Sequence, residues 1–365
     1  MIVTPSACAV IVTNETVAPL YLARLRAQLG AYYSRVDEVV LPDGEQHKGF
    51  ESLNRIVDHL HIDRDAEIQR LIDGLRVSPA MIEPKYFYDP LGCAIYAAIC
   101  QLDEYYPTRT EAAIFQQYRS EIAAKIGDCG TFVDLGAGDC AKALQWLPSI
   151  KPQRYLAIDI AGPSLATALA NMAPEFPQTE MVGLVTDFSL SLNIPADLLT
   201  TPSTLFYPGS SIGNFTPAAA TKFLREMRRA TNGGSLLIGV DAKKDKRRLD
   251  AAYDDALGVT AAFNLNALRH INRVIGADFD TRQWRHVGAY NEALGRIEMH
   301  LESRVEQSVM IGGRARTFAK AERIHSENSY KYSRAEFEAM MREAGFADIS
   351  VWTDVDEAFW VFFAR

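Results

Sequence analysis

Between residues 131 and 242, short apolar runs alternate with longer stretches in which apolar residues recur every three or four positions. Short apolar runs are typical of buried strands, and the longer period is typical of amphipathic helices. Strands and helices in regular alternation predict a parallel, doubly wound α/β sheet. The predicted strands are 131–135, 154–159, 181–186, 203–207 and 235–241.

The segments on either side of this region, residues 63–130 and 243–330, lack the regular alternation. A capping box, Thr108 to Glu111, is expected to open a helix that runs to Ile126. We interpret the two segments as the parts of a helical and β substrate-binding domain, the second being an insertion that covers the crevice of the sheet. The other predicted elements are helices 63–75, 91–102, 246–257 and 258–275 and strands 296–304 and 306–315.

Residues 331–365 return to the sheet. A second capping box, Ser333 to Glu336, opens a helix that Gly345 ends. Two apolar runs, 349–353 and 359–364, then predict a hairpin whose last strand lies antiparallel in the sheet.

Residues 1–62 form a separate segment by the same criteria. Apolar runs and helical periods alternate and predict half of a doubly wound sheet, a βαβα fragment. Its expected elements are strands 9–12 and 36–41 and helices 14–29 and 49–59.

Candidate chemistry lies at the carboxyl ends of three predicted strands. Gly136 and Gly138 follow the first strand, where glycine lets a ligand approach backbone N–H groups. Asp159 ends the second strand, where a carboxylate can accept both hydroxyls of a ribose. Asp187 and Phe188 end the third, and an acid beside an aromatic ring suits an adenine. An acid-x-G-x-G pattern favours S-adenosylmethionine over a dinucleotide, and the alternative is a set of ordinary strand-end loops.

The loop 208–217 follows the fourth strand and therefore lies beside the same crevice. Asn214 can donate there to a substrate carboxylate, or it can form an Asx turn. The segment before the sheet is dense in tyrosine, which combines an apolar ring with a hydroxyl and suits a pocket for a small polar ligand. These tyrosines are Tyr86, Tyr88, Tyr96, Tyr105 and Tyr106.

Composition narrows the function classes. The 365 residues carry a net charge of −8, and no block of Lys and Arg suggests nucleic acid. The longest apolar run, 91–100, is too short to cross a membrane. Five cysteines without a CxxC motif read as thiols of a cytoplasmic protein, and no His, Cys and carboxylate cluster predicts a metal site. We expect a monomer.

Residues 9–60 resemble the N-terminal, nicotinamide-binding part of 3-dehydroquinate synthase, through IVTNETVAPLYLARL and VVLPDGEQHKGFESLNRI. The resemblance implies that the segment with Asp43, Gly44, Glu45 and Lys48 matches one that helps to hold a dinucleotide. The glycine-rich loop and the zinc ligands of that family do not follow, so its activity is not predicted. We interpret residues 1–62 as an appended fragment.

Residues 65–365 resemble the histidine-specific, S-adenosylmethionine-dependent methyltransferases that make hercynine for ergothioneine. The matching segments are PKYFYDPLG, DEYYPTRTEA, VDLGAGDCAK, GSSIGNFTP, AYDDALGVTAAFNLNALRHINR, RIEMHLES and SENSYKYS. The resemblance implies a class I, Rossmann-like methyltransferase fold, with S-adenosylmethionine as co-substrate and no metal. Its cofactor contacts would be Tyr105, Gly136, Lys142, Asp159, Asp187 and Phe188.

The resemblance also implies how L-histidine is held, with tyrosine hydroxyls as the catalytic groups that orient its amine. The residues are Asn214, Tyr253 and Gly209 at the carboxylate, Tyr88 and Tyr105 at the amine, and Glu327, Ser329 and Met299 at the imidazole. Tyr96 and Tyr330 stand where the family often has other residues. By residue type alone, Glu327 and Ser329 can equally be a solvated strand end.

Methyl transfer to an amine needs a neutral nitrogen in line with the S–CH3 bond, so positioning and proton removal should dominate catalysis. Two alternatives stay open. One is a relative that methylates another amino acid, such as a tryptophan derivative. The other is a cofactor-binding protein without catalysis that uses residues 1–62 as an interaction surface.

Overall fold

The computed structural model describes most of the chain, which divides into two units, residues 1–70 and 71–365. In the first unit the parallel strands β1 (Cys8–Asn14) and β2 (Arg35–Leu41) are connected through α1 (Ala18–Leu29). The helix predicted from Asn14 begins at Ala18 because Asn14 still belongs to β1. Helix 49–59 and the segment from Asp43 to Lys48 lie outside the described residues. These are 8–16, 18–29, 35–41, 64–189, 192–231 and 233–365.

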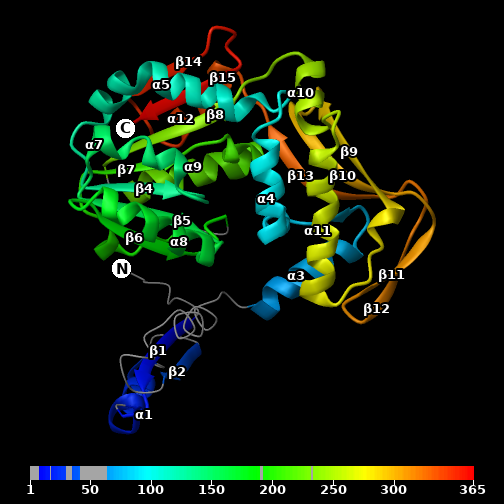
Figure 1. The fold of residues 1–365 in the computed structure, drawn as a ribbon, viewed down its shortest axis with the longest axis horizontal. Coiled ribbons are helices and arrows are strands. Elements are labelled where there is room, and N and C mark those ends of the chain that lie inside the picture. The colour runs from blue at the N-terminus through cyan, green and yellow to red at the C-terminus, as the bar shows by residue number, and fades with distance from the viewer. Residues whose placement is uncertain (1–7, 17, 30–34, 42–63, 190–191, 232) are drawn as a thin grey trace. The chain divides into compact units, whose positions relative to one another are not determined.

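The second unit contains a seven-stranded sheet of order β14-β15-β8-β7-β4-β5-β6 (Figure 1). β15 is antiparallel to both of its neighbours, and the remaining strands are parallel to one another. The predicted doubly wound sheet is confirmed, and so is its antiparallel strand, β15, which is the last strand of the chain. The strands are β4 (Thr131–Leu135), β5 (Arg154–Asp159), β6 (Glu180–Val185), β7 (Ser203–Tyr207), β8 (Ser235–Asp241), β14 (Ile349–Thr353) and β15 (Phe359–Ala364).

Helices cover both faces of this sheet because neighbouring strand residues enter different cores. Phe132 packs with α5, α7 and α8, whereas Val133 packs with α9 and α12. Phe132 also stacks on Phe206 of the neighbouring strand β7, which lies two residues beyond its direct register partner, and the ring centroids are 5.4 Å apart. The helices are α5 (Tyr106–Ile126), α6 (Ala141–Leu144), α7 (Leu147–Ile150), α8 (Gly162–Met172), α9 (Pro217–Thr231) and α12 (Arg334–Glu343), with 3-10 turns η3 (Ala173–Glu175), η4 (Ala196–Leu198) and η5 (Ser211–Asn214).

A second lobe of the same unit is built on a four-stranded sheet of order β3-β13-β10-β9. Its core holds residues of α3, α4 and α11 and is separate from the two cores of the large sheet. The elements are α3 (Arg64–Arg76) from Leu71 onward, β3 (Ala80–Met81), η2 (Pro84–Phe87), α4 (Pro90–Ile99), α10 (Lys246–Tyr253), α11 (Val259–Ile275), η6 (Thr281–Gln283), β9 (Trp284–Asn291), β10 (Arg296–Ser303), β11 (Gln307–Ile311), β12 (Arg314–Phe318) and β13 (Arg323–Tyr330).

Two sequence predictions about helix ends are wrong. The box Thr108 to Glu111 does not open a helix, because α5 already begins at Tyr106 with a proline in its first turn. The helix predicted over 246–257 ends at Tyr253. The Asp255 carboxylate accepts from the N–H groups of the first turn of α11, so the chain cannot stay helical up to that point.

Two further differences concern strands. The strand predicted over 306–315 is the hairpin β11–β12, which turns at Gly312 and Gly313 where φ is positive. Strands β9 and β13 were not predicted. The segment after the glycine loop forms two short helices, α6 and α7. The second capping box, Ser333 to Glu336, is confirmed with both of its hydrogen bonds.

Within the described ranges no helix is both long and apolar enough to cross a membrane.

Candidate active site

The glycine loop after β4 adopts the conformation that its sequence predicts. Gly136 and Gly138 have φ of 71° and 56°, a region that favours glycine. The Asp159 carboxylate accepts from the N–H of Gly138 at 2.9 Å and of Ala161 at 2.8 Å. A Cβ on Gly138 would meet no atom within 4 Å, so the loop backbone borders open space. A ligand can therefore approach the backbone beside the Asp159 carboxylate.

Asp187 and Phe188 lie at the end of β6, next to this loop. Lys85 of the second lobe donates to the Asp187 carboxylate at 3.2 Å. The Phe188 ring stacks on Phe223, and its tip would lie 3.7 Å from a Cβ on Gly136. The residues predicted at the three strand ends are therefore together at one edge of the sheet.

Glu111 is a site residue that sequence reasoning missed. This buried carboxylate accepts from the N–H of Gly209 and from the Nζ of Lys142, both at 2.7 Å. It thus holds α5, the segment after the glycine loop and the loop after β7 together. A Cβ on Gly239 would lie 2.0 Å from the Glu111 Oε1 atom, so β8 needs glycine at that position. The helical position of Glu111 carried no sequence signal beyond a capping box, which is not formed.

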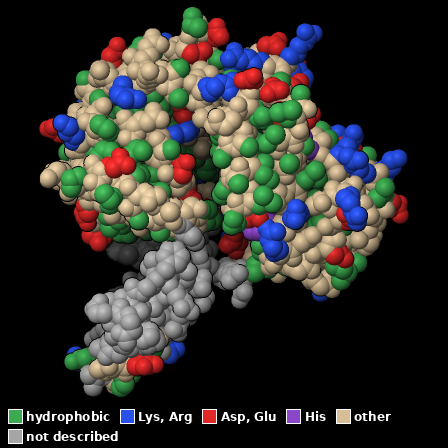
Figure 2. Space-filling model, in the orientation of Figure 1, with side chains coloured by type: hydrophobic (Ala, Val, Ile, Leu, Met, Phe, Trp, Pro, Cys, Tyr) green, Lys and Arg blue, Asp and Glu red, His purple; other side chains and the backbone are tan. Residues whose placement is uncertain are grey.

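A cavity lies where the loop after β7 meets the second lobe. On the face drawn in Figure 2, a furrow separates the lobe of the seven-stranded sheet from this second lobe. The cavity is open to solvent at one end, and its empty space, with the open mouth included, is about 520 Å³. All eight residues predicted for the substrate line it. They are Tyr88, Tyr105, Gly209, Asn214, Tyr253, Met299, Glu327 and Ser329, joined by Tyr96, Ile99, Ser210, Ser211, Ala252, Thr260 and Phe263.

Three polar groups of the cavity have no hydrogen-bond partner among the described residues: the Tyr88 hydroxyl, the Asn214 amide and the Glu327 carboxylate. Burial raises the pKa of Tyr88 well above its usual value, so it stays a neutral donor. Burial also raises the pKa of Glu327 to about 7, although the Lys331 ammonium opposes the rise. All three residues are half-buried, and polar groups withdrawn from solvent normally have partners, so this set is suited to a polar ligand.

These contacts decide two of the alternatives left open by the sequence. The Asn214 side chain forms no Asx turn with a described residue and lines the cavity. Glu327 and Ser329 are neighbours on one face of β13 and line the cavity as well, so they are not a solvated strand end.

The two unusual tyrosines differ in their surroundings. Tyr96 lies in the cavity wall, with its hydroxyl 3.5 Å from that of Tyr105 and its ring edge-on to Tyr88 at 5.7 Å. The Tyr330 hydroxyl instead accepts from Arg296 at 2.6 Å, and Tyr330 does not line the cavity. Only the change at Tyr96 therefore alters the cavity wall.

Behind the cavity, Lys331 donates to the Tyr253 hydroxyl at 3.0 Å and to the Ser329 hydroxyl at 2.8 Å. Its side chain is completely buried, and its third contact is the Asp241 carboxylate at 2.8 Å. Neither Lys331 nor Asp241 was a sequence candidate, because a lysine and an aspartate at strand ends usually face solvent.

The geometry fits S-adenosylmethionine. An open glycine loop, the Asp159 carboxylate and the pair Asp187 and Phe188 follow successive strands of a sheet with one terminal antiparallel strand. That sheet and loop define a class I, S-adenosylmethionine-dependent methyltransferase. In the described part of the chain, no group of three or more His, Cys, Asp or Glu residues could hold a metal ion.

The family model for histidine-specific, S-adenosylmethionine-dependent methyltransferases matches residues 67–365, and the chain belongs to this family. The match leaves out most of the first structural unit. The predicted methyltransferase family and fold class are confirmed for this part of the chain.

Three curated relatives illustrate the range of the similarity. A histidine N-alpha-methyltransferase of Mycolicibacterium smegmatis is 37% identical, over 82% of this chain and 95% of that protein. A protein of the same name from Mycobacterium tuberculosis is 35% identical, over 81% and 92%. A 4-dimethylallyltryptophan N-methyltransferase of Claviceps purpurea is 26% identical, over 80% and 92%.

Proposed function

We propose that this protein transfers three methyl groups from S-adenosylmethionine to the α-amino group of L-histidine, which yields hercynine, the first step of ergothioneine biosynthesis. The observation that carries the proposal is the Glu327 carboxylate, which lines the cavity without a hydrogen-bond partner in the described part of the chain. An imidazole N–H would complete it with a charge-assisted hydrogen bond. The family membership and the two mycobacterial relatives support the same substrate.

We assign the cofactor contacts to the residues at the carboxyl ends of β4, β5 and β6. Asp159 is suited to the ribose hydroxyls, and Asp187 with Phe188 to the adenine. S-adenosylmethionine supplies the methyl group when bound. These contacts would be made by Tyr105, Gly136, Lys142, Asp159, Asp187 and Phe188.

We assign the substrate contacts by the chemistry of each wall. The Asn214 amide can donate to the carboxylate, next to Gly209 and Tyr253. Glu327 and Ser329 can bond the imidazole, against which Met299 packs. Each assignment is supported by the position of the residue in the cavity wall.

Tyr88 and Tyr105 are the proposed catalytic residues, which orient the amine. Each transfer forms an N–C bond at the α-nitrogen and breaks the S–C bond. The first two transfers each release one proton from the nitrogen, and the third leaves a quaternary ammonium. An α-amino group titrates near pH 8 in reference peptides and somewhat higher in a free amino acid, so a modest fall in its pKa supplies the neutral nucleophile. A nearby sulfonium lowers that pKa by like-charge repulsion.

The direct test is mass spectrometry of L-histidine incubated with the protein and S-adenosylmethionine, with tryptophan, tyrosine and phenylalanine in parallel. Three added methyl groups on histidine alone are expected. Methylation of another amino acid in preference to histidine would refute the substrate. Cofactor binding without methylation of any of them would favour a protein without catalysis.

The relative from Claviceps purpurea makes a tryptophan derivative the second candidate substrate. Glu327→Ala separates the two candidates, because a histidine site then loses its imidazole partner. An affinity for histidine that is unchanged in Glu327→Ala would contradict the histidine assignment.

We further propose that residues 1–62 are dispensable for methylation, that residues 63–130 and 243–330 form the substrate-binding domain, and that residues 131–242 and 331–365 form the cofactor-binding sheet. The start of the family match at residue 67 supports the first boundary. Deletion of residues 1–62 is expected to leave the specific activity unchanged, whereas loss of activity would refute the boundary.

A further inference from the structure

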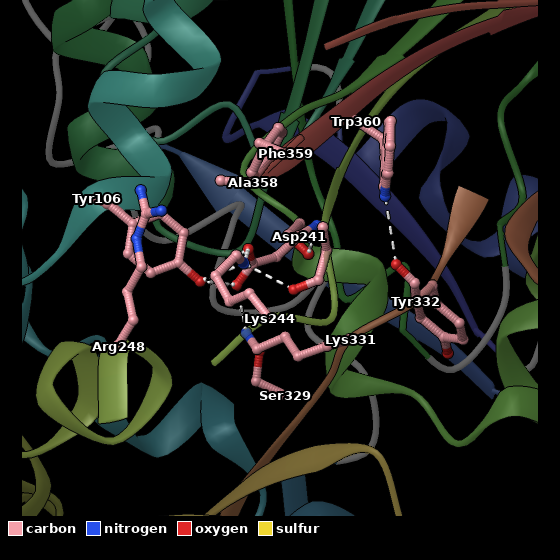
Figure 3. Close-up of polar contacts among 12 residues, drawn as sticks. Tyr106, Asp241, Lys244, Arg248, Ser329, Lys331, Tyr332, Ala358, Phe359 and Trp360 are labelled. Atoms are coloured by element: carbon pink, nitrogen blue, oxygen red, sulfur yellow. Dashed lines mark hydrogen bonds and ion pairs between the residues drawn. The ribbon is translucent and has the colours of Figure 1, made fainter. Parts of the chain in front are cut away.

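A buried ion pair stands directly behind the cavity. Asp241, at the end of β8, and Lys331, just after β13, are both without solvent exposure, and the Nζ of Lys331 is 2.8 Å from Asp241 Oδ2. Figure 3 shows the side chains of Tyr106, Lys244 and Lys331 converging on Asp241, with Ser329 on the other side of Lys331. The Tyr106 hydroxyl donates to both carboxylate oxygens, at 2.8 and 2.9 Å.

Both members of this pair remain charged. Burial alone would raise the pKa of Asp241, but the ammonium groups of Lys331 and Lys244 outweigh it and lower that pKa below its usual value. Burial alone would lower the pKa of Lys331, but the Asp241 carboxylate outweighs it and raises that pKa. Lys331 therefore acts as a fixed ammonium with three donors.

All three of these donors are used. One goes to Asp241 Oδ2, one to the Ser329 Oγ at 2.8 Å and one to the Tyr253 hydroxyl at 3.0 Å. Tyr253 in turn donates to the Ser329 Oγ at 2.9 Å. The Ser329 oxygen thus accepts two hydrogen bonds, which fills both of its lone pairs. What it has left to offer is its own proton.

Ser329 lines the cavity, two residues after Glu327 on the same face of β13. This wall of the cavity consequently presents one acceptor, the carboxylate, and one donor, the hydroxyl. A neutral imidazole carries one N–H and one bare nitrogen, whereas an indole carries only an N–H. The carboxylate and the hydroxyl together complement an imidazole, whereas an indole would leave the Ser329 hydroxyl without an acceptor.

We propose that Lys331 is a positioning residue that commits the Ser329 hydroxyl to donate into the cavity, so that the site reads the bare nitrogen of a neutral imidazole. The inference rests on the proposed function and adds to it how the ring is recognised. The sequence contained no sign of it, because the direction of the hydroxyl depends on where the lysine lies in the fold.

Lys244 offers a matched control. It is a second, partly buried lysine on the same Asp241 carboxylate, but its other contacts are the Tyr106 hydroxyl and the carbonyl of Ala242, which do not line the cavity. Lys331→Met and Lys244→Met each remove one ammonium from Asp241 and leave the other. Only the first removes the donor to Ser329.

The experiment is a double-substitution cycle on steady-state kinetics of the full chain. Lys331→Met is expected to raise KM for histidine about tenfold and to leave KM for S-adenosylmethionine within about twofold. Lys244→Met should change KM for histidine by less than about threefold. Ser329→Ala should raise KM for histidine about tenfold alone but less than about threefold when Lys331→Met is already present, since Lys331 acts through Ser329.

An equal cost of Ser329→Ala in both backgrounds would overturn the proposal, as would equal effects of the two lysine substitutions. The unaltered protein supplies a measurement that needs no variant: calorimetric binding of two pyrrolylalanines, in which one or the other ring nitrogen of histidine is replaced by C–H. Each is expected to bind at least about tenfold more weakly than histidine. One of the two isomers keeps its N–H toward Glu327, and if that isomer binds as tightly as histidine, the proposed role of the Ser329 proton is refuted. Absence of histidine methylation by the unaltered protein would instead refute the proposed function.

Discussion

Replacement of Glu327 by glutamine should make the ligand-free protein more stable while it weakens substrate binding. The carboxylate is surrounded by the cavity wall, and no described residue donates a hydrogen bond to it. Glutamine has nearly the same shape and carries no charge. The substitution therefore removes the cost of a buried charge without leaving a cavity behind.

The size of this effect follows from the pKa. Burial raises the pKa of Glu327 from 4.5 to about 7. At 1.36 kcal/mol for each pKa unit, this rise corresponds to about 3 kcal/mol of disfavoured ionisation. The figure is an upper limit, because the half-buried side chain also faces water in the cavity.

The sign of the pH dependence follows from proton binding. Between pH 4.5 and about 7 the folded protein binds this proton and the unfolded chain does not, so the stability that the group contributes is complete below pH 4.5 and is lost as the pH rises to about 7. Glu327→Gln should thus exceed the unaltered protein in free energy of unfolding by up to about 3 kcal/mol at pH 8 and by less than about 1 kcal/mol at pH 5.

The assay is urea denaturation of both proteins without ligand at several pH values. Glu298→Gln is a control of opposite sign. Burial would raise the pKa of Glu298, but Arg296 outweighs it and lowers that pKa. Glu298 therefore contributes stability above its unfolded pKa that is lost as the pH falls through its folded pKa. A difference between Glu327→Gln and the unaltered protein that stays constant from pH 5 to pH 8 would refute the reasoning, because the carboxylate would then be hydrated.

Three further predictions concern the contacts around the cavity. Glu111→Ala removes the acceptor for Lys142 and Gly209, so the free energy of unfolding should fall by about 2–4 kcal/mol. Calorimetry should show about tenfold weaker binding of S-adenosylmethionine, and an unchanged cofactor affinity would show that Glu111 does not contribute to the cofactor site. Gly239→Ala places a Cβ 2.0 Å from Glu111 Oε1, and urea denaturation should register a loss of about 1–3 kcal/mol or more. Tyr96→Phe removes only a 3.5 Å contact between hydroxyls, so KM for histidine should change by less than about threefold, and a tenfold change would assign Tyr96 a substrate contact.

The sheet of the second unit was predictable because burial on both faces leaves a mark on the sequence. The strands at 131–135 and 203–207 are buried at every position, three residues in five of each are apolar, and each strand was predicted at its observed length. Strand β9 mixes apolar residues with Arg285, His286 and Asn291, and strand β13 carries an unbroken polar run from His325 to Ser329. Such mixed patterns resemble loops, and these two strands were missed.

The candidate site divides in the same way. The proposed substrate residues were found through segments that match a family. All eight of them line the cavity in the structure. Glu111 and Lys331 were not found, because each acts from behind the wall. Both are buried charged residues, whose burial is set by tertiary packing and not by their neighbours in sequence.

Two carboxylates near Lys331 show why residue type alone could not identify such groups. Asp241 has Lys331, Lys244 and Tyr106 as partners, and its pKa is lowered. Glu327 feels the same ammonium but receives no hydrogen bond from the described residues, and its pKa is raised. The first carboxylate is complete without a ligand and fixes the lysine, while the second is destabilised until an N–H donor arrives. A ligand that donates an N–H to Glu327 relieves this destabilisation, and the free energy gained adds to its binding. The burial that lowers the stability of the ligand-free protein therefore increases the preference for a ring that can donate to Glu327 and accept from Ser329.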